Sequence, residues 1–160
     1  MKLELFPAYE RKEELRPLYK EYAEMLVACY PEFAPSLTQQ NYDEELNHLY
    51  DKYGFPTGCI YVLHADGKVA GCIGLKPIDD TCCELKRLYI RPEFRGHDLG
   101  RLLVQQVIDD ARDIGYKYLR LDTLPPLKSA IKLYREMGFY DIDCYYDCLV
   151  PGTIFLEFTL

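Results

Sequence analysis

Two spacings of hydrophobic and polar residues along the chain predict its strands and helices. Residues 2–6 alternate apolar with charged side chains, a period of two that is typical of a short strand. Over residues 10–29 the apolar positions recur every three or four residues, which predicts a helix; Pro17 either bends this helix or starts its main part. A loop flanked by two prolines follows. Ser36 is then the predicted N-cap of a second helix that reaches about Tyr53.

The middle of the chain predicts three antiparallel strands. Two apolar runs, 59–65 and 68–75, are joined by Asp66-Gly67, a dipeptide typical of two-residue hairpin turns. A second turn leads into a third strand over 81–90, which an Arg-Pro pair ends because proline cannot donate to a ladder.

The second half predicts a parallel strand pair. Helical periodicity over 100–114 stops at Gly115, and a strand follows over 117–122. A strand–helix–strand unit of this length makes its two strands parallel. The remaining elements are a shorter helix that Gly138 ends and two final strands, at residues 139–142 and 153–158. The predicted fold class is therefore α/β with a mixed sheet.

Composition places the chain among folded domains. Its 160 residues, 49% of them hydrophobic, are enough for a sizeable core, so we expect a single domain over residues 1–160. The charged start lacks the apolar core of a signal peptide, and no apolar run is long enough for a membrane span. We expect a soluble, cytoplasmic protein with no membrane partner.

Cysteine usage and charge narrow the function classes further. The seven cysteines are odd in number and scattered, which argues against a disulfide framework. Their spacing lacks the pairs of a structural zinc site, so we expect free thiols and no metal. A formal net charge of -7 argues against a nucleic-acid partner and suits a cationic acceptor such as an amine.

A candidate anion site lies between the third strand and the helix after it. The segment 95–100, RGHDLG, places two glycines at a helix N-terminus, where unpaired amides and the helix dipole favour negative charge. Walker and dinucleotide glycine motifs are absent from the sequence. Five basic residues against two acidic ones surround the segment: Lys86, Arg87, Arg91, Arg95 and Arg101. The alternatives are a solvated strand face and an ordinary strand-to-helix turn with Asp98 as N-cap.

This segment resembles the acyl-CoA-binding motif of the GNAT family of N-acetyltransferases, Arg/Gln-x-x-Gly-x-Gly/Ala, with Asp98 standing where the family usually has glycine. Because a carboxylate beside a pyrophosphate would repel it, we expect the Asp98 side chain to point away and cap the helix. Residues 130–139, AIKLYREMGF, resemble a second stretch of the same family, and the two matches cover roughly residues 58–140. The resemblance implies a GNAT-like mixed sheet: antiparallel N-terminal strands, a parallel pair at the cofactor cleft, and about four flanking helices. It also implies an acetyl-CoA-dependent transfer of an acetyl group to a primary amine of an unidentified acceptor, and a homodimer.

The resemblance implies two catalytic residues. Tyr134 is the candidate acid, because a phenol can protonate the departing thiolate; the alternative is a core tyrosine whose hydroxyl bonds elsewhere. Glu84 is the candidate base that deprotonates an ammonium substrate; the alternative is a cross-strand ion pair.

The implied cofactor site is larger. The backbones of Leu88 and Ile90 would pair with the pantetheine arm, Lys128 either reaches the 3'-phosphate or is solvated, and Leu127 stands where the family often has asparagine. The predicted cofactor-binding residues are Leu88, Tyr89, Ile90, Arg95, Gly96, His97, Asp98, Leu99, Gly100, Arg101, Leu127, Lys128 and Ala130. The acceptor pocket is expected at Tyr145, Tyr146 and Asp147, facing Tyr30 and Phe33. Two rival functions remain open, a non-catalytic acetyl-CoA or CoA sensor and an interaction domain with a decayed site.

Overall fold

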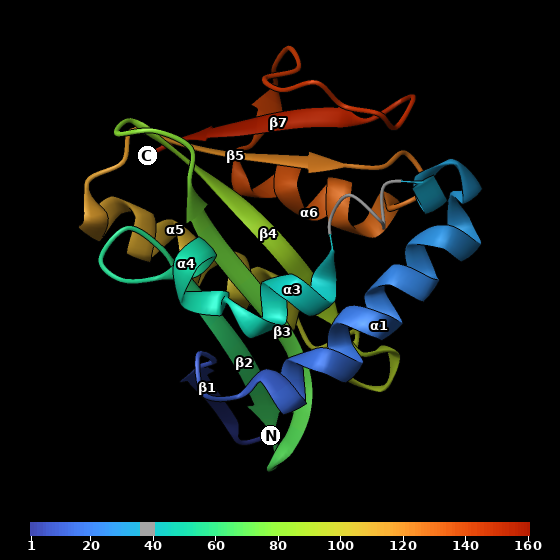
Figure 1. The fold of residues 1–160 in the computed structure, drawn as a ribbon, viewed down its shortest axis with the longest axis vertical. Coiled ribbons are helices and arrows are strands. Elements are labelled where there is room, and N and C mark those ends of the chain that lie inside the picture. Colours follow the sequence, from blue (N-terminus) through green and yellow to red (C-terminus); the bar gives the residue numbers. More distant parts are fainter. Residues whose placement is uncertain (36–40) are drawn as a thin grey trace.

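A mixed β-sheet forms the centre of the protein (Figure 1), whose computed structural model describes residues 1–35 and 41–160. The strands are β1 (Leu3–Pro7), β2 (Cys59–Ala65), β3 (Lys68–Pro77), β4 (Cys82–Ile90), β5 (Tyr118–Thr123), β6 (Tyr140–Asp141) and β7 (Ile154–Thr159). Their order across the sheet is β1-β2-β3-β4-β5-β7-β6. Strands β4 and β5 are parallel and the other pairs are antiparallel. The predicted mixed sheet with one parallel pair is confirmed.

Five α-helices lie in the described part of the chain, where about four were expected. They are α1 (Lys12–Cys29), α3 (Tyr42–Asn47), α4 (Leu49–Tyr53), α5 (Leu99–Ile114) and α6 (Lys128–Met137), with short 3-10 helices η1 (Pro31–Phe33) and η2 (Pro92–Phe94). Helix α1 runs through Pro17 without a break. No helix among these residues is both long enough and apolar enough to span a bilayer.

The predicted second helix is divided, which accounts for the extra one. His48 leaves the helical region at φ -134° and separates α3 from α4. The predicted N-cap, Ser36, lies outside the described residues. Within them, Asn41 caps α3, because its side chain accepts a hydrogen bond from the Glu44 amide.

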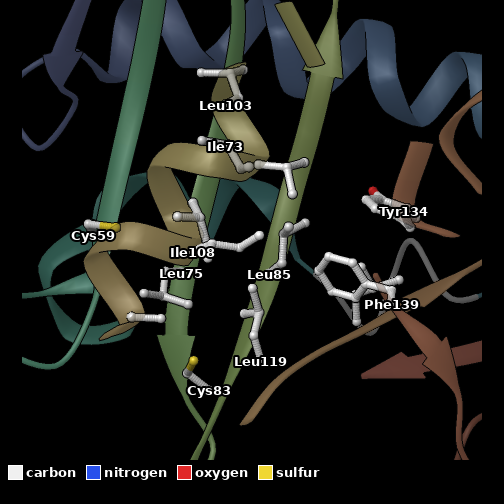
Figure 2. Close-up of a cluster of buried hydrophobic side chains, with 14 of the residues drawn as sticks. Cys59, Ile73, Leu75, Cys83, Leu85, Leu103, Ile108, Leu119, Tyr134 and Phe139 are labelled. Carbon is white, nitrogen blue, oxygen red and sulfur yellow. The ribbon is translucent and has the colours of Figure 1, made fainter. Parts of the chain in front are cut away.

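The helices cover both faces of the sheet and bury one apolar cluster on each. Helices α5 and α6 pack on one face, where Figure 2 shows Leu103 and Ile108 of α5 beside the sheet residues Ile73, Leu75 and Leu85. Helices α1, α3 and α4 pack on the other face. Each fully buried leucine or isoleucine contributes about 1.5–3 kcal/mol, so these clusters hold the helices on the sheet.

The parallel pair separates part-way along its length, as Figure 1 shows. Strands β4 and β5 pair only from Cys82 to Glu84 on β4, although β4 continues to Ile90. A bulge adds to the divergence, because two β4 residues, Arg87 and Leu88, lie opposite one residue of β3. Arg87 takes the positive φ of 61° that accommodates this extra residue. The β5-facing edge of β4 is therefore open beyond Glu84.

Candidate active site

A cleft of about 1370 Å³ opens where β4 and β5 part. Its walls come from β4, the loop before α5, α6, the end of α1 and the connection between β6 and β7. Every residue predicted to be catalytic or cofactor-binding lines this cleft. The fold thus brings into one cleft residues that are about 50 positions apart in the sequence, from Glu84 on β4 to Tyr134 on α6.

One end of the cleft is built for an anion. The N-terminus of α5 opens onto it, and Gly96 precedes the helix at φ +84°, a conformation that glycine adopts without strain. Gly100 lets α5 approach α6 closely, since a Cβ there would lie 3.3 Å from a Leu133 methyl carbon. Four basic side chains of these segments line the cleft, namely Arg95, Arg101, Lys128 and Lys132; Arg101 and Lys132 form ion pairs with Glu136, which also lines it.

Asp98 takes the N-cap position of α5 but does not cap it. Its backbone is left-handed at φ 59°, and its side chain makes no hydrogen bond to the helix amides. The carboxylate is 85% exposed and lies 3.9 Å from the Nε of Arg101. The prediction of a side-chain cap is wrong. The left-handed backbone explains why glycine or aspartate suits this position.

The open edge of β4 presents Ile90 to the cleft. The Arg91 amide donates to the Ala70 carbonyl of β3, so the alternation of an antiparallel pair turns the backbone groups of Ile90 the other way. The Ile90 carbonyl accepts a hydrogen bond of 2.9 Å from the Arg95 Nε. Its amide is then the Ile90 group available to a ligand in the cleft.

Tyr134 is buried beside the cleft with its hydroxyl unpaired. The ring packs 5.5 Å from that of Phe139 (Figure 2), and only 5% of the residue is exposed. Within residues 1–35 and 41–160 the hydroxyl forms no hydrogen bond, so the alternative of a tyrosine bonded elsewhere in the core finds no support there. Burial, and then the negative charge of Asp122, raise the pKa of Tyr134 above that of an ordinary phenol. The side chain therefore stays protonated at neutral pH.

Glu84 lies in the same cleft and is 5% exposed. Its Oε1 lies 3.7 Å from the Nζ atoms of both Lys76 and Lys86. Its Oε2 accepts a hydrogen bond from the Tyr145 hydroxyl. Burial, and then the negative charge of Glu84, raise the pKa of Tyr145. This phenol therefore stays protonated and can donate its hydrogen bond to Glu84 at neutral pH. The cross-strand ion pair weighed as the alternative exists, and it also fixes the carboxylate in the cleft.

The predicted acceptor residues line the far end of the cleft. The Tyr146 hydroxyl donates to Asp122 at 2.6 Å, and Arg120 lies 5.3 Å from the centre of the Tyr145 ring. Phe33 lines the cleft, whereas the Tyr30 hydroxyl bonds to the Pro151 carbonyl. Arg120 thus already contacts an aromatic ring expected to receive a cationic amine.

Comparison with known proteins agrees with this geometry. The profile of the Acetyltransferase (GNAT) family matches residues 18–139. The chain belongs to the GNAT family. It is 41% identical over 136 residues to an uncharacterised N-acetyltransferase of Schizosaccharomyces pombe, covering 83% of each chain.

Solved structures share the fold of this N-acetyltransferase. A PaiA N-acetyltransferase from Thermoplasma acidophilum, crystallised in complex with coenzyme A, superposes with a TM-score of 0.81 at 22% identity over 100% of both chains. An acetyltransferase from Streptococcus agalactiae gives 0.78 at 22% identity, covering 99% of this chain and 98% of that one.

Three further residues of this GNAT enzyme line the cleft and were missed by sequence reasoning: Lys52, Lys76 and Asp122. Two of them could have been proposed from the sequence. Lys76 lies directly opposite Glu84 in the β3–β4 register, and both were recognisable as charged residues of neighbouring strands. Asp122 lies near the carboxyl end of a parallel strand, where α/β proteins place ligand-binding groups. Lys52 comes from α4, and only the tertiary fold brings it to the cleft.

Proposed function

We propose that this enzyme transfers the acetyl group of acetyl-CoA directly to a primary amine. Glu84 takes the proton of the substrate ammonium, and Tyr134 protonates the thiolate that leaves. The observation that carries the proposal is the protonated phenol of Tyr134, which has no hydrogen-bond partner in the described residues and lies in the same cleft as the Glu84 carboxylate.

The residues present fit acetyl-CoA as the cosubstrate. The glycine-containing loop and the N-terminus of α5 suit a pyrophosphate, and the basic side chains of that end add charge. The open edge of β4 offers the Ile90 amide to an amide-bearing arm. Leu127 packs against an apolar cluster, so it adds contact area rather than a polar group.

The proton balance follows from these positions. As the amine nitrogen bonds to the acetyl carbon and the carbon–sulfur bond breaks, the nitrogen loses a proton and the sulfur gains one. Glu84 accepts the first proton, directly or through water, and its Oε1 lies 3.7 Å from the Nζ atoms of Lys76 and Lys86. Tyr134 supplies the second proton, and burial ensures that it holds one to give.

The proposal is tested by ligand-dependent unfolding and turnover. Acetyl-CoA at 100 times its dissociation constant is expected to stabilise the fold by about 2.7 kcal/mol, a rise in Tm of roughly 5–10 °C. ATP is the anion control and should give no comparable rise. Incubation with a panel of amines should then release CoA in step with an acetylated product.

The outcomes separate the rival functions. A rise in Tm without turnover on any amine would favour the acetyl-CoA sensor. No rise with millimolar acetyl-CoA would favour the interaction domain. The single domain over residues 1–160, the cytoplasmic location and the homodimer stay predictions, and light scattering of the purified chain tests the homodimer.

A further inference from the structure

Three lysines line the same cleft as Glu84, and two of them, Lys76 and Lys86, contact its carboxylate. We call Lys52, Lys76 and Lys86 the lysine cluster; all three line the cleft. Their side chains are only 29%, 29% and 18% exposed. They come from three elements, α4, β3 and β4, so no single amphipathic pattern accounts for their meeting here.

The ion pairs of the cluster contain more cations than carboxylates; Glu44 and Asp51 line a second hollow beside Lys52 and Lys76 but form no ion pair with them in the described residues. Lys76 and Lys86 share one oxygen of Glu84. Lys52 shares Glu45 with Arg87, whose Nη2 lies 2.8 Å from the same carboxylate oxygen. Four cations thus meet two carboxylates. The other two acidic groups at this end of the cleft, Asp122 and Asp147, form no ion pair with the cluster in the described residues.

Burial and neighbouring cations both act on the pKa of Lys52. Burial, and then the positive charge of Arg87, lower the pKa of Lys52 to about 8, and Lys86 adds to the effect. An anion bound here would relieve the repulsion between cations that are partly removed from water.

The arrangement matches a zwitterion. A single carboxylate, Glu84, lies between two ammonium groups, each 3.7 Å from the same oxygen. A ligand with an ammonium and a carboxylate on neighbouring carbons presents the opposite charges at a similar spacing. A diamine would instead place a second cation against the lysines.

Resting on the proposed function, we propose that the acceptor is an amino acid, or a small molecule with the same adjacent amine and carboxylate. Lys76 and Lys86 bind its carboxylate, and Glu84 receives its ammonium. Lys52 adds to the positive field from the α4 side. The net charge of -7 favours cations over the protein as a whole, but this local surface selects an anionic group.

The test compares matched acceptors at saturating acetyl-CoA. The panel contains the twenty amino acids, their amides, and the corresponding decarboxylated amines, including lysine with cadaverine. We expect at least one amino acid to have a kcat/KM about 10- to 100-fold above those of its amide and its amine, since hydrogen bonds to charged groups contribute about 1.5–3 kcal/mol.

Variants then locate the selectivity. In the double variant Lys76→Gln/Lys86→Gln, KM for the preferred amino acid should rise about 10- to 100-fold, and the amide should become an equal substrate. Lys86→Arg keeps the charge and should retain the preference. Lys68→Gln, on the exposed hairpin turn far along β3, is the matched control and should behave like the parent.

Several results would overturn the inference. Amides that react as well as the amino acids would point to a peptide N-terminus. A preference that survives in the double variant would remove the lysines from recognition. If acetyl-CoA raises Tm but no amino acid of the panel is acetylated, the inference is wrong and the cofactor assignment stands; if acetyl-CoA fails to raise Tm, the proposed function fails first.

Discussion

Proton transfer to the leaving thiolate depends on one hydroxyl, that of Tyr134. Replacing Tyr134 by phenylalanine removes only this oxygen and leaves the ring against Phe139. We expect kcat to fall about 10²- to 10⁴-fold, the usual contribution of a general acid, while the Kd for acetyl-CoA stays nearly constant. Steady-state rates and calorimetric titration measure the two. Tyr140→Phe, whose hydroxyl bonds Glu157 and Thr159 outside the cleft, is the control. An unchanged kcat for Tyr134→Phe would exclude it as the acid.

Glu84→Gln tests the base with almost no change of shape. The amide oxygen can still accept from Tyr145, but it cannot take a proton from the substrate. The loss of rate should be largest at low pH, where the acceptor amine is charged, and should shrink as the amine loses its proton in solution. A pH–rate profile on one amine measures this. A loss of equal size at every pH would mean that Glu84 acts through structure alone.

Glu45 couples folding to pH through its buried contact with Arg87. Two hydrogen bonds, of 3.0 and 2.8 Å, join the side chains. Burial alone would raise the pKa of Glu45, but Arg87 and Lys52 lower it to about 2. Because the unfolded chain takes up this proton near pH 4.3, stability should fall as pH drops from about 5 to 2.

A matched pair of variants isolates that contribution. Glu45→Gln should lower the free energy of unfolding at pH 7 by about 3–5 kcal/mol, since Arg87 stays buried without a counter-charge. Asp43→Asn, which removes an ion pair with Arg16 from an 87% exposed side chain, should cost about 0–1 kcal/mol. Urea unfolding at several pH values measures both. Equal losses would mean that the Glu45–Arg87 pair adds no more than a surface contact.

At the scale of the element, the start of α5 combines an unusual backbone with an unfavourable charge. Asp98 has φ 59° and does not cap the helix, and its carboxylate lies at the end of the cleft expected to hold phosphates. Asp98→Asn keeps a residue that tolerates this backbone and removes the charge. We expect acetyl-CoA to bind up to about fivefold more tightly, within the 0.2–1 kcal/mol of an exposed charge pair, and the gain to fade in high salt. Asp98→Gly also removes the charge but frees the backbone, so comparing it with Asp98→Asn separates the effect of the backbone from that of the charge. A higher Kd for acetyl-CoA in both variants would contradict the charge argument.

Local sequence signals predicted the elements that depend on local chemistry. Asp66 and Gly67 both have positive φ, as their hairpin turn requires, and Gly115 and Gly138 end their helices in the same region of φ. The break at His48 was missed because apolar spacing continues through it. Tyr134 and the glycine loop could be found by resemblance. Lys52 could not, because its contact with the cleft depends on how α4 packs over the sheet.

At the scale of the whole molecule, the cleft lies between two parts of one sheet that share three paired positions. A small apolar cluster joins the parts again across the cleft, from Leu26 of α1 and Phe33 of η1 to Leu124 after β5 and Val150 before β7. By contrast, the far edge of the sheet is continuous, with β1 paired to β2 at five positions. A ligand in the cleft should therefore change local motion near the divide and leave the far edge alone.

Hydrogen exchange at short labelling times tests this, because exchange then occurs through local openings rather than global unfolding. Acetyl-CoA should slow the amides of residues 88–101, which form the open edge and the α5 loop, and leave the β1–β2 pair unchanged. ATP at the same concentration serves as the control. If calorimetry shows binding while residues 88–101 exchange as before, the ligand binds elsewhere. Protection of residues 88–101 with an unchanged β1–β2 pair would place acetyl-CoA at the open edge of β4 and the α5 loop, where the sheet divides.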